Sequence, residues 1–369
     1  MAAHPTVRET ATGYRVTFTD DVGEPPFLTL DCDFLERATW GLLTSLTVRT
    51  NVPTARRLPD GVVLIDRINL LRGRDLKDVA FRTGQLIDGS GRSSQDWLRY
   101  LETAAVLINA EMQTPIPAQE LVDAPLPKLQ RFLIEGLLAQ GKANILYGPG
   151  GTGKSVLAAR IAAALHYDED IFGLRVRDHG RTLYLDWEDD SDTMVERLER
   201  VCQGMGVARF PFAYKSLHGK GPYERHHADV KEYLKANRDI KLVVFDSTAM
   251  ALHGSTNGDT ADGVIKLYAL VGQLPVTSLL IDHVSSDDIK DTKGGAAKPY
   301  GSVFKVNSAR NVWEVRPWNP EGGLAGFSLH HRKTNVSKRM RTIQVGVRWD
   351  DFEVIFEGEQ ELPTEEAEA

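Results

Sequence analysis

A glycine-rich segment in the middle of the chain constrains its fold more than any other part of the sequence. The segment Gly148–Ser155 reads GPGGTGKS and matches the pattern G-x-x-x-x-G-K-[ST]. It directly follows the apolar run ANILY at 143–147, which predicts a strand, and directly precedes a segment at 155–165 that predicts a helix. Glycines let backbone N–H groups converge on phosphate oxygens, and the helix N-terminus adds the positive end of its dipole. The segment therefore predicts a triphosphate-binding loop.

This phosphate loop supplies two side chains suited to a nucleotide and its metal ion. Lys154 is expected to reach the β- and γ-phosphates, and the Ser155 hydroxyl to ligate Mg²⁺. Asp246 ends the apolar strand at 242–245, where a carboxylate can hold Mg²⁺ through its water shell, although an Asp at a strand end is also a common turn residue. The expected ligands are ATP and Mg²⁺. The predicted nucleotide-binding residues are Gly148, Pro149, Gly150, Gly151, Thr152, Gly153, Lys154 and Ser155.

Glu188 is the candidate that activates the attacking water. It follows the strand expected at 182–187, and in a parallel sheet it projects over the same edge as Asp246. Asp186, Asp189 and Asp190 compete for the same role. The alternative is that the whole acidic group forms a solvated turn and helix cap.

The pattern around the phosphate loop alternates between helices and apolar strands. Strands are expected at 182–187, 241–246 and 276–282, which indicates a parallel sheet covered by helices on both faces. The strand-rich stretch from 311 to 356 predicts an antiparallel extension of that sheet. Helices are expected at 128–140, 155–165, 191–204 and 260–273.

Changes in composition and pattern along the chain predict four segments. Residues 1–112 predict a small α+β N-terminal domain, and 113–127 hold four prolines, as expected of a semi-rigid linker. Residues 128–356 form the expected ATPase domain. The tail 357–369 contains six glutamates and no Lys or Arg, which predicts an acidic disordered end. Within the first segment we expect strands at 14–20, 27–32 and 39–51 and helices at 74–86 and 95–111.

Composition also indicates in which cellular compartment the protein is expected. Cys32 and Cys202 are too few for a disulfide framework or a structural zinc site, which favours a reducing cytosol. No uninterrupted apolar stretch approaches the roughly 18–20 residues of a membrane span, and the first residues lack the apolar region of a signal peptide. We expect a cytoplasmic protein without a membrane partner.

Three segments together resemble the RecA-like P-loop ATPases. They read FLIEGLLAQGKANILYGPGGTGKS, RTLYLDWEDDSDTMVERLERV and KLVVFDS, and the resemblance covers about 128–345. Within that group the chain is similar to the branch of RepA-type replicative helicases and phage ATPases. This branch places its catalytic glutamate one strand after the phosphate loop, where Glu188 lies. The resemblance implies an ATP-hydrolysing enzyme of a bacterial or phage-infected cell.

The resemblance also implies roles for residues outside the phosphate loop. His283 follows the strand at 276–282, where related ring helicases place a sensor of the γ-phosphate. Arg310 lies where the family carries an arginine finger that reaches the nucleotide of a neighbouring subunit, and Lys333 lies where related ATPases place a further contact in trans. For each, the alternative is an ordinary structural residue.

Two glycine-rich loops are the expected contacts with single-stranded DNA, at 247–263 and 285–300. The second offers cations for phosphates and an aromatic ring for a base, but three aspartates balance its three lysines. A basic cluster later in the chain is denser, with a solvated hairpin tip as its alternative. The candidate residues are Lys290, Lys293, Lys298 and Tyr300 in the second loop, and Arg332, Lys333, Lys338, Arg339 and Arg341 in the cluster.

The sequence thus predicts an ATP-hydrolysing ring motor, expected to be a homohexamer, that acts on single-stranded DNA in replication or recombination. The N-terminal domain is a candidate for recruiting a replication or recombination protein. One alternative is an oligomeric switch whose nucleotide state controls a protein partner without translocation. A small-molecule phosphotransferase is disfavoured, because we find no arginine-rich lid in the sequence.

Overall fold

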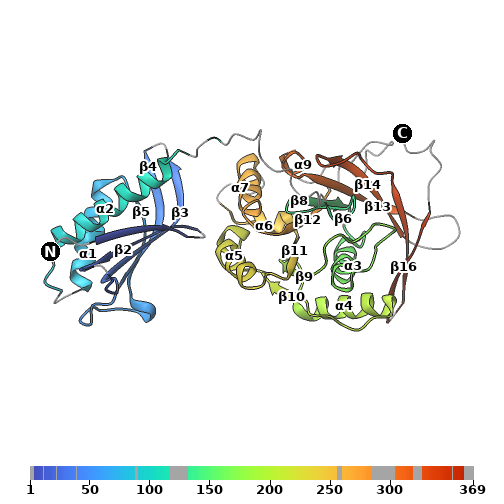
Figure 1. Ribbon diagram of the computed structural model, residues 1–369, viewed down its shortest axis with the longest axis horizontal. Helices are drawn as coiled ribbons and strands as arrows, with labels where there is room; N and C mark the ends of the chain where they lie inside the picture. Colours follow the sequence, from blue (N-terminus) through green and yellow to red (C-terminus); the bar gives the residue numbers. More distant parts are fainter. Residues whose placement is uncertain are drawn as a thin grey trace. The chain divides into compact units, whose positions relative to one another are not determined.

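The chain divides between Pro125 and Leu126 into two units, and each builds a sheet of its own (Figure 1). The computed structural model describes residues 4–10, 12–21, 23–38, 40–87, 90–115, 118, 132–255, 260–284, 304–318, 326–350 and 352–360.

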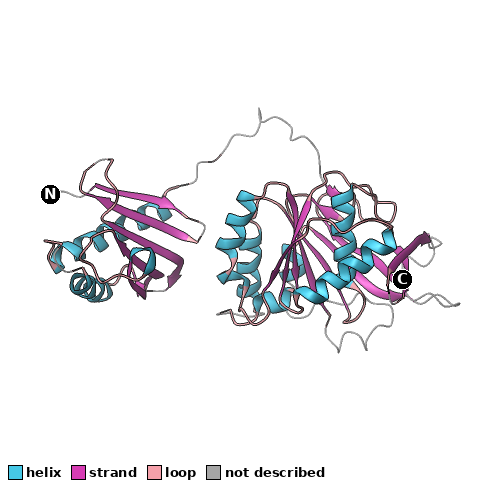
Figure 2. Ribbon diagram, turned by 90° about the horizontal axis from the view of Figure 1, so that it is seen from below, coloured by secondary structure: helices cyan, strands magenta, loops and turns pink. Residues whose placement is uncertain are grey.

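The first unit is an antiparallel sheet with two helices on one face (Figure 2). Its strands pair in chain order, and β4 alternates between buried and partly buried residues because one face packs on the helices. Ser93 and Asp96 form a capping box that starts the second helix. The expected strands and helices of this unit are confirmed. Its elements are β1 (His4–Glu9), β2 (Gly13–Thr19), β3 (Leu28–Ala38), β4 (Gly41–Thr50), η1 (Pro59–Gly61), β5 (Val62–Asn69), α1 (Gly73–Leu86) and α2 (Ser94–Gln113).

The second unit has a nine-stranded sheet in the order β10-β9-β11-β12-β8-β13-β14-β15-β16. The strands from β10 to β13 are parallel to their neighbours, and those from β13 to β16 pair antiparallel, as the sequence predicts. The strands are β8 (Ala143–Gly148), β9 (Arg181–Asp186), β10 (Ala213–Ser216), β11 (Ile240–Asp246), β12 (Thr277–His283), β13 (Asn311–Trp318), β14 (Gly326–Thr334), β15 (Ile343–Trp349) and β16 (Val354–Gln360).

Helices cover both faces of this sheet (Figure 2), which is why its parallel strands are apolar along their length. α3 and α4 pack on one face with a core that includes Leu157 and Met194, and α5, α6 and α7 pack on the other around Phe245. The helices are α3 (Lys154–Tyr167), α4 (Ser191–Met205), η2 (Tyr223–Arg225), α5 (His227–Ala236), α6 (Thr248–Leu252), α7 (Ala261–Val271) and α9 (Phe304–Ser308).

The expected helix at 128–140 is wrong. Its described part forms a hairpin of β6 (Phe132–Ile134) and β7 (Leu138–Ala139), with Gly136 at φ 69° in the turn. Two buried asparagines hold the hairpin. Asn144 exchanges hydrogen bonds with the backbone of Ala139 at 2.7 and 3.1 Å, and Asn311 donates to the carbonyl of Gly136 at 2.9 Å. These contacts satisfy hairpin backbone groups that would otherwise be buried unpaired.

The expected boundary of the acidic tail is also wrong, because β16 continues to Gln360. Glu357 pairs with Gly346 and Glu359 with Val345 of β15. Arg348 lies 3.4 Å from the Glu357 carboxylate, which offsets one of the negative charges. Backbone pairing with β15 therefore extends the sheet into the glutamate-rich segment.

Most of the expected linker at 113–127 falls outside the described residues. In the described part of the chain, no helix is both long and apolar enough to cross a membrane.

Candidate active site

Four parallel strands bring their carboxyl ends to one edge of the large sheet. β8 ends at Gly148, β9 at Asp186, β11 at Asp246 and β12 at His283. Asp246 lies beside Asp186 in the strand register, and His283 lies beside Gly148. Residues more than a hundred positions apart in the sequence therefore meet around the phosphate loop, which is the usual position of ligand sites in parallel α/β sheets.

The phosphate loop depends on glycine at several positions. Gly151 and Gly153 have φ of 73° and 77°, and Gly153 is the N-cap of α3. A Cβ on Gly148 would lie 2.2 Å from the Val315 carbonyl oxygen of the neighbouring strand, so a larger residue cannot fit there without moving the backbone. The Thr152 hydroxyl donates to the Pro149 carbonyl at 2.9 Å, which stabilises the turn.

Lys154 is buried at the first position of α3. Its Nζ donates to the carbonyl oxygens of Gly148 at 3.0 Å and Pro149 at 2.7 Å. Burial lowers the pKa of this ammonium group, while the carboxylates of Asp246 and Glu188 act in the opposite direction. The cation is thus held inside the loop by neutral carbonyl groups.

Asp246 is 2% exposed and accepts a hydrogen bond from the Tyr184 hydroxyl at 2.5 Å. Burial raises the pKa of Asp246, and the Ser155 side chain beside it acts to lower it. Its other oxygen, Oδ1, makes no ordinary hydrogen bond with the described residues. A buried carboxylate oxygen without a donor, next to a serine hydroxyl, fits a hydrated Mg²⁺ ion.

Glu188 faces His283 across the edge of the sheet. The distance from His283 Nε2 to Glu188 Oε1 is 3.4 Å, and both side chains are 36% exposed. The contact with His283 is the main reason why the pKa of Glu188 lies below its usual value, and Ser247 and Lys154 add to the effect. An ionised carboxylate that water can reach has the properties of a group that orients a nucleophilic water.

The three aspartates that compete with Glu188 have structural contacts. Asp186 accepts hydrogen bonds from the backbone N–H groups of Glu188 and Asp189 at 3.0 and 2.9 Å. Asp189 pairs with Arg197 at 2.6 Å. Asp190 caps α4 by accepting from the Thr193 N–H at 2.9 Å. These contacts form the turn that presents Glu188. Three of the four acidic residues therefore have the turn and cap roles of the alternative interpretation, and Glu188 is left for the catalytic one.

Arg310 does not lie with the other candidates. It directly precedes β13, and its backbone N–H donates to the carbonyl of Ala143, the first residue of β8, at 2.9 Å. Because β8 and β13 are parallel, this is the edge of the sheet opposite to Gly148, about 16 Å away at a strand rise of about 3.3 Å per residue. The Arg310 residue is exposed there.

Lys333 lies on the same far edge, where its ammonium group is held by its own chain. Nζ donates to the carbonyls of Val306, Asn307 and Ala309 at 2.9, 2.8 and 2.8 Å. An ammonium group has three donors, so these contacts account for all of them. They cap the end of α9 directly before Arg310.

The structure describes only some of the residues that are predicted to contact DNA. Lys290, Lys293, Lys298 and Tyr300 lie outside the described residues. In the basic cluster, Arg332 pairs with the buried Glu314 at 2.5 Å, and Lys333 caps α9. Its exposed members are Lys338, Arg339 and Arg341.

Sequence reasoning missed two side chains of the site. Tyr184 holds Asp246 from the neighbouring strand, and Arg197 lies close enough to Tyr184 and Asp246 for their charges to act on it. The signal for Tyr184 is its position two residues before Asp186, which places it on the same face of β9. Arg197 carries no comparable signal, because arginines are common in helices and nothing in the sequence places this one against Tyr184.

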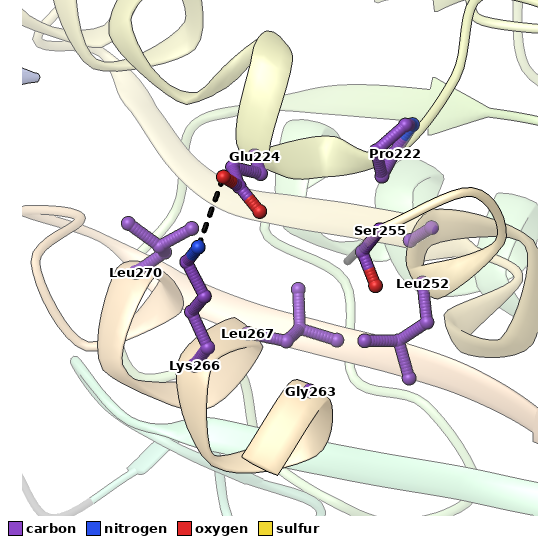
Figure 3. A pocket seen from close by; sticks show the side chains of 9 residues that line it. Pro222, Glu224, Leu252, Ser255, Gly263, Lys266, Leu267 and Leu270 are labelled. Atoms are coloured by element: carbon purple, nitrogen blue, oxygen red, sulfur yellow. Dashed lines mark hydrogen bonds and ion pairs between the residues drawn. The ribbon is translucent and has the colours of Figure 1, made fainter. Parts of the chain in front are cut away.

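A small groove lies away from the phosphate loop, between η2, α6 and α7 (Figure 3). Lys266 and Glu224 form an ion pair across it at 2.9 Å, and Leu252 and Leu267 supply apolar walls. No phosphate-loop residue lines this groove, so it is separate from the candidate active site.

The order of the parallel strands and the position of the phosphate loop at their edge are those of a RecA-like P-loop fold. A family model described as an AAA domain matches residues 111–288, which contain the phosphate loop, Glu188, Asp246 and His283. Among solved structures, the chain is similar to a KaiC-like protein from the hyperthermophilic archaeon Pyrococcus horikoshii. The two share 15% sequence identity with a TM-score of 0.42, over 66% of this chain and 100% of that chain.

No curated protein matches the chain. The expected fold, RecA-like with a small N-terminal domain, is confirmed. The match of the family model to residues 111–288 supports a P-loop ATPase. The RepA-type branch stays a prediction. Arg310 and Lys333 lie beyond the segment that the family model matches.

The pKa of Glu188 gives a testable pH dependence. Its carboxyl is held below its usual pKa chiefly by His283, so turnover that needs the ionised form should fall only in strongly acidic solution. His283→Ala removes the contact that lowers the pKa of Glu188 but leaves the burial that raises it, so this pKa should rise. The acid limb of the kcat profile should then move to higher pH, as measured by phosphate release between pH 4 and 8.

The exposed His179 provides the matched control, since His179→Ala should leave the profile unchanged. Circular dichroism at each pH should verify that the variants stay folded. An acid limb in the same place for His283→Ala and the wild type would show that this contact does not set the ionisation of Glu188.

Proposed function

We propose that this protein is an oligomeric ATPase that hydrolyses ATP at sites between subunits and uses the energy to move along single-stranded DNA. The observation that carries the proposal is the cluster of Lys154, Asp246, Glu188 and His283 at one edge of the sheet, with the exposed Arg310 at the opposite edge. A subunit with this arrangement has the phosphate-binding half of a site on one side. It can offer a cation to a second copy from the other.

The proposed mechanism assigns each residue a step. The phosphate-loop N–H groups and Lys154 bind the triphosphate, so that the ammonium group exchanges its carbonyl partners for phosphate oxygens. Ser155 and Asp246 would hold Mg²⁺, which would supply positive charge to neutralise the charge that develops on the phosphates. Glu188 orients water towards the terminal phosphorus. His283 contacts Glu188 and is the last residue of β12, so it can relate phosphate loss to the segment that follows.

Substitution of the two central residues should separate binding from turnover. Lys154→Ala removes the cation that faces the phosphates and should abolish tight ATP binding. Glu188→Gln keeps the size of the side chain but removes the charge, so ATP should still bind while kcat falls on the order of a hundredfold or more. Calorimetric binding and phosphate release measure the two effects.

Asp189→Asn is a suitable comparison for Glu188→Gln, because it removes a charge from the same turn. It should leave kcat within a few-fold of the wild type. A Glu188→Gln variant with full turnover would exclude Glu188 as the residue that activates water.

Arg310 should act in trans. Arg310→Ala should lower kcat on the order of a thousandfold, as for an arginine finger, and leave the ATP affinity of each subunit nearly unchanged. In mixtures with inactive Lys154→Ala subunits, some interfaces combine an intact phosphate loop with an intact Arg310, and activity should reappear. Two inactive variants that stay inactive at every mixing ratio would argue against a shared site.

A nucleotide-controlled assembly switch is the second candidate function. It is favoured by the contacts of Arg332 and Lys333. Both side chains bind groups of their own chain, Glu314 and the Ala309 carbonyl, which leaves fewer cations of the predicted basic cluster for DNA. The two candidates differ in their response to single-stranded DNA. A motor should show ATP turnover raised several-fold by an oligonucleotide, with the effect weakening as salt is raised. A switch should show turnover independent of the oligonucleotide.

The triple variant Lys338→Ala, Arg339→Ala, Arg341→Ala tests whether the exposed part of the cluster contributes to that response. Wild-type turnover with no change at any oligonucleotide concentration, together with ATP-dependent assembly, would replace the motor by the switch.

A further inference from the structure

The end of β15 places an exposed aromatic side chain beside the phosphate loop. β13 runs parallel to β8, β14 is antiparallel to β13, and β15 is antiparallel to β14. The carboxyl end of β15 therefore points to the same edge of the sheet as Gly148, where the phosphate loop begins. The last residue of β15 is Trp349.

The Trp349 indole approaches the first turn of α3. A Cβ on Gly153 would lie 4.0 Å from Cζ2 of the indole, an ordinary van der Waals distance. The Trp349 residue is 49% exposed. A large aromatic group that is half in solvent at this position leaves a flat apolar surface next to the triphosphate-binding loop.

The geometry points to Trp349 as the surface on which the nucleobase stacks when a nucleoside triphosphate occupies the phosphate loop. This inference rests on the proposed function of that loop and names the residue that recognises the other end of the ligand. A nucleotide carries its base one ribose beyond the phosphates, so the base must lie near the loop rather than in it. Indole and nucleobase are both planar π-systems, and stacking them removes two apolar faces from water.

The position relative to the other site residues supports the assignment. Asp246 and Glu188 come from β11 and β9, and in the sheet order these strands lie on one side of β8, whereas β15 lies on the other. The metal and the attacking water thus belong to one side of the phosphate loop, and Trp349 leaves the opposite side available for the base. Stacking tolerates any base because every base has a π-face, so Trp349 contributes affinity without distinguishing adenine from guanine.

The test compares nucleotides with a ligand that has phosphates but no base. Trp349→Ala should weaken the binding of ADP and GDP about tenfold or more, and should leave the affinity for inorganic tripolyphosphate unchanged. Trp349→Phe should restore most of the nucleotide affinity. The exposed Trp40 of the first unit is the matched control, and Trp40→Ala should bind every ligand as the wild type does.

A second measurement does not depend on the strength of tripolyphosphate binding. A base that stacks on the Trp349 indole should quench the fluorescence of that indole. ADP should therefore quench the tryptophan fluorescence of Trp40→Phe as strongly as that of the wild type. The same titration should lose most of its signal in Trp349→Phe.

Three results would overturn the inference. Unchanged ADP affinity in Trp349→Ala would show that the base binds elsewhere. An equal loss for ADP and tripolyphosphate would show that Trp349 supports the loop. A change in oligomeric mass with unchanged ADP affinity would assign the indole to a contact with a second copy of the chain. If instead Lys154→Ala and the wild type both fail to bind any of the ligands, the proposed function of the loop fails as well.

Discussion

The candidate site depends on the parallel register of four strands. Asp246 is buried and needs a cation or a metal ion to compensate its charge, and Lys154 is buried and needs acceptors. Neither requirement can be met by neighbours in the sequence. It is met because β8, β11 and β12 end at the same edge, where the Lys154 ammonium group lies within the field of Asp246, Glu188 and Asp282. The strand order therefore fixes the electrostatics of the phosphate loop before any ligand binds.

A buried ion pair joins the residue next to His283 to the helix that precedes Arg310. Asp282 directly precedes His283, and its carboxylate pairs at 3.0 Å with Lys305 of α9, with both side chains fully buried. Burial raises the pKa of Asp282, and Lys305 opposes that shift. Breaking such a pair is costly because it leaves a buried charge without a partner. The residue next to His283 is therefore tied to α9, which ends two residues before Arg310.

For residues at or just after the ends of strands, the sequence alone was enough to predict that they meet at one edge of the sheet. Asp246, Glu188 and His283 each follow an apolar run, and in a parallel sheet the ends of such runs share one edge whatever the length of the connections. The hairpin at β6 and β7 was not predictable in the same way, because FLIEGLLAQ has apolar residues at spacings that also suit a helix. Its form is decided by Asn144 and by Asn311, which is more than 170 residues away. The position of Trp349 likewise emerges only when three successive pairings from β8 to β15 are known.

The location of Arg310 constrains how copies of this chain can assemble if it is to serve as a finger. Its backbone is fixed beside Ala143, at the opposite end of β8 from the phosphate loop, so it cannot complete the site of its own subunit without unpairing β13. Contact between this edge and the phosphate loop of a second copy joins two different surfaces. Such a contact is heterologous, and repetition of a heterologous contact gives either a closed ring or an open filament, not an isolated two-fold dimer. Lys333 strengthens this geometry by fixing the end of α9, because an arginine on a rigid support loses less conformational entropy when it binds a phosphate group. The arrangement that denies Arg310 access to its own nucleotide is thus the one that the proposed contact in trans requires.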